Sequence, residues 1–192
     1  MQRDKCLKPN EGIPSSLVAL LAVMAGVSVA NLYYCQPLLN LIREDTGLTE
    51  FQVNLMPVFT QIGYALGLLF IIPMGDLYNR RSTILICFGA LFFSLLTIAS
   101  SNNVMTLLVA SFITGVFSVA PQIFIPFVSQ FSRKEEKERK VGLVLSGLLV
   151  GILGSRVASG YVGDIFGWRT MYGIAAGLIA ISAVIVMKTF PY

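Results

Sequence analysis

Residues 104–130 read VMTLLVASFITGVFSVAPQIFIPFVSQ, an uninterrupted run without one charged side chain. About 20 apolar residues are enough for a helix to cross the hydrocarbon core of a bilayer. Five further apolar stretches fill most of the remaining chain, at 14–38, 52–75, 82–100, 141–163 and 170–188. The sequence therefore predicts an all-α membrane protein with six transmembrane helices.

The composition supports this class. Of the 192 residues 55% are hydrophobic and only 12% are charged, and the mean hydropathy is +0.76. Soluble domains carry about 25% charged residues. The gaps between the apolar stretches are too short for a soluble domain. We expect a cytoplasmic tail over 1–13, a six-helix bundle over 14–188, and the start of a truncated linker over 189–192.

Basic residues gather on one side of the predicted bundle. Eleven of the 14 lysines and arginines precede the first span or follow the second, fourth or sixth. Only Arg43 and Arg169 fall on the other side, and Arg156 falls inside the fifth span. The positive-inside rule then predicts that both termini are cytoplasmic. The net charge of +4 thus reports topology and does not indicate a nucleic-acid partner.

Several chemistries lack their usual residues. The chain has no histidine, and its cysteine count of three is odd, which argues against a metal site and against a disulfide framework. A serine intramembrane protease needs a histidine partner, and an aspartyl one needs two facing carboxylates. No carboxylate lies deep in a predicted span, so proton coupling is not explained by this chain. We expect no enzyme activity, no cofactor and no metal.

A short internal repeat is visible. The segment 75–81 reads GDLYNRR, and the segment 163–169 reads GDIFGWR. Each lies between the second and third spans of a three-helix set. Because three is odd, the two copies are predicted on opposite membrane faces. Inverted three-plus-three repeats are typical of secondary transporters.

The segment ending the second span resembles the signature loop of the major facilitator superfamily. Asp76, Arg80 and Arg81 match its acidic and basic positions, whereas Ile72 and Asn79 stand where the family has glycines. Together with the stretches 31–37, 61–81 and 142–169, the chain is similar to the bacterial drug and sugar efflux branch of that family. The likeness covers essentially the whole chain but only the first six-helix half of a twelve-helix carrier.

The resemblance implies a multi-pass carrier of the bacterial inner membrane that exports small solutes by alternating access. Its partners would be the lipid bilayer, a small-molecule substrate and a second six-helix bundle. Asp76 would cap a helix of that second bundle and lock one conformation, while Arg80 and Arg81 would bind nearby acids or headgroups. The acid that the family usually places at the end of the fourth span is not evident, and Gln130 lies there instead.

Arg156 is the most informative single residue, because a charge near the centre of a span is costly unless water or a partner meets it. Helical periodicity places it opposite a stripe formed by Gly147, Gly151 and Gly154. We expect the stripe to pack on a neighbouring helix and Arg156 to face a substrate cavity. The alternative is that Arg156 reaches the interface or pairs with a backbone carbonyl.

Two further sets of residues complete the predicted site. Gly63 and Gly67 form a second small-residue pair for helix packing. Spans 1, 2, 4 and 5 hold most of the polar side chains and are predicted to surround a wet cavity, with spans 3 and 6 facing lipid. The cavity candidates on spans 1, 2 and 4 are Asn31, Tyr34, Gln61, Tyr64 and Gln122.

Three functional hypotheses follow from the half-length resemblance. The chain is a truncated or split first half of a carrier, inactive alone, and this reading is favoured. Alternatively, two copies pair into a homodimeric carrier. The third possibility is a membrane scaffold or regulatory subunit without transport. The charged segment 132–140 is read either as a lipid-headgroup patch or as a plain surface linker.

Overall fold

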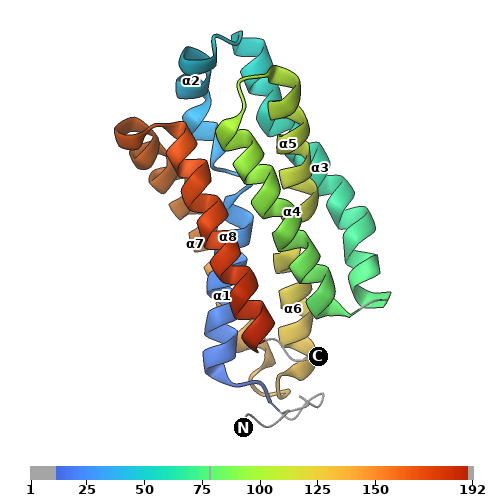
Figure 1. Cartoon of the computed structure of the whole chain (residues 1–192). Helices are drawn as coiled ribbons and strands as arrows, with labels where there is room; N and C mark the ends of the chain where they lie inside the picture. Colours follow the sequence, from blue (N-terminus) through green and yellow to red (C-terminus); the bar gives the residue numbers. More distant parts are fainter. Residues whose placement is uncertain (1–11, 78, 190–192) are drawn as a thin grey trace.

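The computed structural model describes residues 12–77 and 79–189, and within these ranges the chain forms eight helices and no strand (Figure 1). The helices in chain order are α1 (Ser15–Ala30), α2 (Cys35–Thr46), α3 (Glu50–Leu77), α4 (Arg80–Ser100), α5 (Val104–Phe117), α6 (Ala120–Phe131), α7 (Lys137–Phe166) and α8 (Trp168–Thr189).

Eight helices make six spans because two spans are interrupted. α1 and α2 together form the first, Ser15–Thr46, and α5 and α6 form the fourth, Val104–Phe131. α3, α4, α7 and α8 each form one. All six are long and apolar enough to cross a membrane, which confirms the predicted all-α fold with six spans. Most of the predicted tail and linker lies outside the described residues.

The boundaries of the first and fifth spans differ from the prediction. The first extends to Thr46 and ends at Gly47, whose φ of 68° gives the left-handed cap that glycine favours. The fifth begins at Lys137, within the charged segment. Lys140 and Glu136 are one helical turn apart and pair at 2.6 Å, which stabilises helix where the sequence suggested a gap.

Both interruptions precede a proline. α5 ends at Phe117, and the ring of Pro121 would clash with the Phe117 carbonyl if the helix continued. In the first span the residues between α1 and α2 form turns, and Pro37 stands in the same relation to Tyr33.

The inverted repeat extends over the whole described bundle. A shift of 88 residues places α1 on α5, α2 on α6, α3 on α7 and α4 on α8, with every boundary agreeing within three residues. The last turns of α3 and α7 lie at opposite ends of the bundle in Figure 1. The predicted pair of inverted three-helix units is therefore confirmed, and it is far longer than the short motif that first indicated it.

Packing follows the same symmetry. α3 packs chiefly on α5, its repeat counterpart α7 packs on α1, and α4 packs on α8. At the first contact a Cβ on Gly63 would overlap the Phe112 carbonyl, and one on Gly67 would overlap the Val116 carbonyl. The two backbones therefore approach as closely as only glycine allows.

The α1–α7 contact uses glycines in the same way. A Cβ on Gly147 would overlap the Ala22 carbonyl, and one on Gly151 would overlap Gly26. Gly151 is the counterpart of Gly63 in the repeat. Gly154 does not join this contact, contrary to the sequence prediction, because no atom lies within 4 Å of the place of its Cβ. The buried face of α7 continues in steps of four residues through Ser155 instead.

Two arginines bridge α4 and α8 reciprocally. Arg81, at the start of α4, donates from Nη2 to the carbonyl of Met187 near the end of α8. Arg169, at the start of α8, donates from Nη1 to the carbonyl of Ala99 at 3.0 Å, near the end of α4. Both the donors and the acceptors are 88 residues apart. Each arginine thus meets the negative, carbonyl-rich end of the antiparallel partner helix.

The second and fifth spans are the least covered. In the apolar 18-residue stretch of each span, the share buried inside the bundle is 22% for the second span and 11% for the fifth. The same share is 39% for the third and sixth spans. The expectation that spans 3 and 6 provide the main lipid-facing surface is therefore incomplete. α3 and α7 leave larger surfaces for lipid or for another protein.

We expect Gly63→Ala and Gly151→Ala each to lower the free energy of unfolding by about 1–3 kcal/mol, because overpacking forces the backbones apart. Gly89→Ala is the matched control, since nothing lies within 4 Å of its Cβ position. Thermal unfolding in detergent, read with a thiol-reactive dye on the buried Cys35 and Cys87 after Cys6→Ser, measures the effect. Unchanged melting of the Gly63 variant would contradict the close approach.

Arg169→Gln should lower the free energy of unfolding by about 1.5–3 kcal/mol, the range for hydrogen bonds to charged groups. Arg81→Gln should act in the same direction, because it removes the counterpart contact. Lys188→Gln removes the same charge near the end of α8 and should leave melting unchanged. The same dye assay compares the three variants, and equal melting of all three would refute the reciprocal bridge.

Candidate functional site

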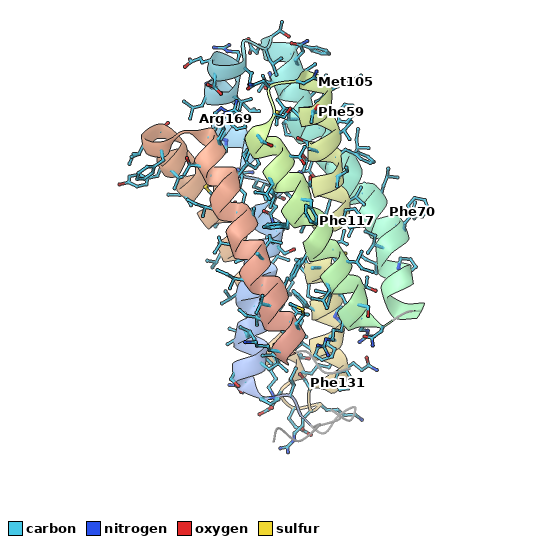
Figure 2. The ribbon with its side chains drawn as sticks, in the orientation of Figure 1. Phe59, Phe70, Met105, Phe117, Phe131 and Arg169 are labelled. Atoms are coloured by element: carbon cyan, nitrogen blue, oxygen red, sulfur yellow. The ribbon has the colours of Figure 1, made fainter. Side chains whose placement is uncertain are left out.

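The polar residues inside the bundle gather where the first and fourth spans are interrupted. Phe117, the last residue of α5, lies near mid-height of the bundle in Figure 2. The interruption between α1 and α2 occupies the equivalent place in the repeat. Irregular backbone at membrane depth occurs where it is buried in protein or lines a water-filled space.

Asn31 closes the end of α1. It is only 3% exposed, and its Nδ2 donates to the carbonyls of Val27 at 3.2 Å and Ser28 at 3.1 Å. Its Oδ1 and the Ser28 hydroxyl are buried without a partner among the described residues. Tyr34, also predicted to line a cavity, is buried in the hydrophobic core instead. The first interruption therefore offers Asn31 but not Tyr34 as a polar group.

Arg156 is exposed on α7 and lies beside the same interruption. Its guanidinium carbon is 5.3 Å from the ring centre of Tyr33, which belongs to the turn between α1 and α2. A cation–π contact at an exposed site contributes about 0.5–1 kcal/mol. Among the residues that the structure describes, no carboxylate pairs with Arg156. Its charge is therefore only weakly compensated by the protein.

A second polar pair lies between α3 and α6. Gln122, two residues after α6 begins, donates from Nε2 to the Tyr64 hydroxyl at 3.2 Å. Gln61 is exposed nearly one turn earlier on α3. In the repeat, Tyr33 corresponds to Pro121, which is the neighbour of Gln122. Arg156 corresponds to Leu68, which lies one helical turn after Tyr64. Each pair therefore joins a helix interruption to one of the two least covered helices.

The signature loop is partly described. Asp76 lies in the last turn of α3, but its side chain is outside the described residues. Arg80 donates from Nη1 to Gln130 Oε1 at 2.9 Å. The amide of Gln130 therefore binds Arg80 at the end of the fourth span, where the family usually has an acid. Asn79, which replaces a family glycine, caps α4 by accepting the Arg81 backbone N–H at 3.0 Å.

A polar cluster at the other end of the bundle was missed. Asp45 Oδ2 accepts from Arg169 Nη2 at 2.8 Å and from Trp168 Nε1 at 3.1 Å. Arg169 Nη2 also donates to Asn102 Oδ1. One signal in the sequence could have indicated this cluster. Arg169 ends the second copy of the repeated segment, on the side of the bundle that has few basic residues. The cluster joins α2, α8 and the α4–α5 connection.

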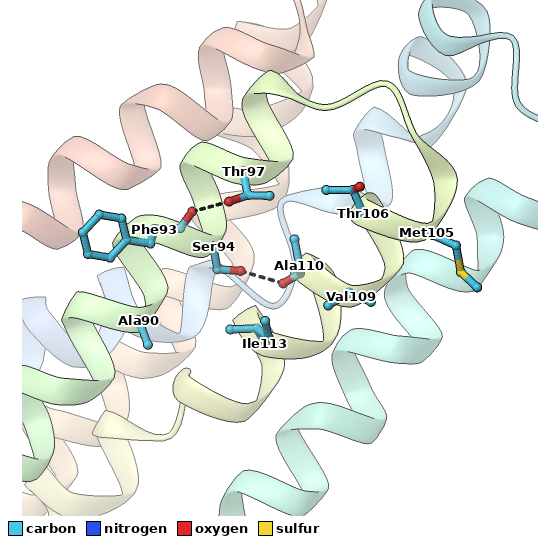
Figure 3. A pocket seen from close by; sticks show the side chains of 9 residues that line it. All are labelled: Ala90, Phe93, Ser94, Thr97, Met105, Thr106, Val109, Ala110 and Ile113. Carbon is cyan, nitrogen blue, oxygen red and sulfur yellow. Dashed lines mark hydrogen bonds between the residues drawn. The ribbon is translucent and has the colours of Figure 1, made fainter.

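An apolar groove of about 530 Å³ runs between α4 and α5 (Figure 3). Two of its hydroxyl groups are bonded within the protein: Ser94 Oγ donates to the Ala110 carbonyl at 2.6 Å, and Thr97 Oγ1 to the Phe93 carbonyl at 2.8 Å. Phe93 and Met105 on its rim are exposed. The groove suits a lipid chain rather than a polar solute.

The chemistry available at the interruptions is recognition. One weakly compensated guanidinium, two exposed or half-exposed amides and two phenol rings can bind a polar or aromatic solute. Among the described residues no three potential metal ligands lie together. The arrangement provides binding groups and no nucleophile with an adjacent base.

Comparison with known proteins gives consistent matches. A family model described as Major Facilitator Superfamily matches residues 18–192. The uncharacterized transporter YgaY of Escherichia coli O157:H7 is 34% identical over 184 residues, covering 96% of this chain and 47% of the relative. The inner membrane transport protein YnfM of Escherichia coli K12 is 26% identical over 195 residues, covering 96% and 46%.

A more distant match is the efflux pump FUB11 of Gibberella fujikuroi, 24% identical over 122 residues, which covers 63% of this chain and 21% of the relative. The chain spans about half the length of the bacterial relatives it matches.

We expect Tyr64 and Gln122 to be coupled. Each of Tyr64→Phe and Gln122→Leu removes the hydrogen bond between α3 and α6, and such bonds in membranes contribute about 0.6 kcal/mol on average. The double variant should therefore lose less stability than the two single losses combined. Unfolding in a denaturing detergent completes the double-mutant cycle, and strict additivity would show that the pair does not interact.

Proposed function

Since this chain belongs to the major facilitator superfamily, we propose that it acts as the first half of a secondary transporter that exports small solutes by alternating access. The inverted repeat, typical of such carriers, and the half-length match to transporters support this proposal. A second six-helix bundle would complete the pathway.

The observation that carries the proposal is the poor cover of α7 and α3 at the level of the polar pairs. Arg156 is exposed beside Tyr33, and lipid contact at this depth is costly for a charged group. A second bundle laid against α3 and α7 would turn this surface into the wall of a wet cavity. Arg156, Gln61, Tyr64 and Gln122 would then face the solute.

The solute class follows from the groups on that wall. A guanidinium beside a phenol ring favours a solute with an anionic or hydrogen-bond-accepting group next to an apolar or aromatic part. The efflux direction is supported by the resemblance to drug and sugar exporters and by the name of the fungal relative.

We place the protein in a bacterial inner membrane with both ends of the bundle cytoplasmic. The start of α1 and the end of α8 lie at the same end of the bundle (Figure 1), and this end carries most of the basic residues. In the signature loop, Asp76, Arg80 and Arg81 would act as the conformational lock toward the second bundle. A homodimer is the second candidate, because the same uncovered faces of α3 and α7 could meet their own copies.

The test is complementation in Escherichia coli cells that lack their main efflux pumps. The cells produce this chain alone, the second half of YgaY alone, or both, and the two halves of YgaY serve as the positive control. Accumulation of fluorescent dyes and labelled sugars is measured. We expect the pair to lower accumulation of at least one compound. Activity of the chain alone, with cross-linked dimers, would establish the homodimer instead.

Arg156→Ala in the active combination should slow export about tenfold, equivalent to about 1.4 kcal/mol of lost interaction. Val150→Ala, at another exposed position of α7, is the matched control and should export normally. If the two halves co-purify and the YgaY control is active, yet no compound is exported, the transporter proposal is wrong and a scaffold role is favoured.

A further inference from the structure

A cavity with charged side chains in its wall lies at the basic end of the bundle, away from the proposed solute surface. It has a volume of about 400 Å³ and lies between the start of α1 and the first turns of α7. Its lining is formed by Ser15, Arg139, Lys140, Gly142, Leu143 and Ser146. Two cations, two hydroxyl-bearing residues and one leucine thus surround a space at the end of the bundle where α1 and α7 begin.

Lys140 is the buried cation of this cavity. Its side chain is buried, yet it lies on the cavity wall. Its Nζ donates to the Ile13 carbonyl at 2.8 Å and pairs with Glu136 Oε2 at 2.6 Å. An ammonium carries three N–H donors, so these two contacts leave one donor. A buried charge is stable only when its donors are satisfied, which favours an acceptor in the cavity.

Arg139 adds a second cation with spare donors. Its side chain is 76% exposed and its nearest acid, Glu136, is 3.8 Å away, beyond hydrogen-bond distance. The pKa of the Glu136 carboxyl lies below its ordinary value because Lys140 hydrogen-bonds to it, so Glu136 stays ionised at neutral pH. Two cations against one carboxylate leave the cavity with a net positive charge.

The surroundings distinguish a lipid from a soluble anion. Leu143 lines the cavity and is exposed, and Val150, two turns further along α7, is exposed as well. A bound group can therefore place its charge at Arg139 and Lys140 while its apolar part follows α7 into the bilayer. No side chain caps the start of α1 at Ser15, which adds weak attraction for an anion.

We propose that this cavity binds the phosphate of an anionic phospholipid, with its acyl chains lying along α7. The site would hold the start of the first span and that of the fifth together through one headgroup. It does not depend on the transport function, because it needs only this chain. The charged segment considered a headgroup patch or a plain linker is in this view partly a lipid site.

Native mass spectrometry of the purified chain tests this proposal by comparing retention of phosphatidylglycerol and phosphatidylcholine from mixed micelles. We expect a clear preference for phosphatidylglycerol. Arg139→Gln should reduce that preference about tenfold, about 1.4 kcal/mol, since a charge-assisted contact is lost. Lys137→Gln removes the same charge from the same turn of α7 but does not line the cavity, and should retain the preference.

Two further arms separate the possibilities. Ser146→Leu fills the cavity without changing charge and should also abolish the preference, while its melting temperature without lipid reports that it folds. Inorganic phosphate at millimolar concentration should not displace the lipid. Equal losses for Lys137→Gln and Arg139→Gln would show diffuse surface attraction and overturn the site. Displacement by phosphate would show a soluble anion in place of the lipid.

Discussion

The close approach of helix backbones at glycine is the constraint on which the structure depends. Between membrane helices there is little hydrophobic driving force, so association relies on packing and on short-range contacts. Gly63 and Gly67 bring α3 onto α5, and Gly147 and Gly151 bring α7 onto α1. Because α3 and α7 bury little surface inside the bundle, these glycine contacts largely determine the positions of the two helices. One member of each polar pair lies on α3 or α7, so the positions of these helices also determine the geometry of the pairs.

The repeat gives the bundle two versions of each interaction. The same shift of 88 residues relates the glycine contacts, the helix interruptions and the arginine bridges between α4 and α8. The polar residues break this symmetry. Arg156 and Asn31 occupy positions whose counterparts are Leu68 and Val119, so the scaffold is duplicated while the recognition groups are not. The two halves of the symmetrical frame thus carry different polar pairs, Arg156 with Tyr33 on one and Tyr64 with Gln122 on the other.

The sequence predicted six spans and their inverted arrangement because hydropathy and charge placement act locally or over whole helices. It did not reveal the interruption at Asn31, since Pro37 lies several residues beyond it. The prediction placed Gly154 on the packed face because it assumed a contact face parallel to the axis of α7. The buried face instead winds around the helix in four-residue steps through Ser155. The Asp45–Arg169 contact joins residues 124 positions apart, and a single sequence holds no measure of such proximity. The cavity beside Lys140 was missed for the same reason.

The unequal sequence distances of the two glycine contacts have a consequence for biosynthesis. α3 and α5 are separated only by α4, so their contact can form soon after the fourth span emerges. Ala22, in contrast, meets Gly147, and Ile13 meets Lys140, which at ribosomal speed means a delay on the order of ten seconds. Throughout that interval the first span resides in the bilayer without its final neighbour. The seam between the first and fifth spans therefore forms late in synthesis, and only the packing of α8 on α4 follows it.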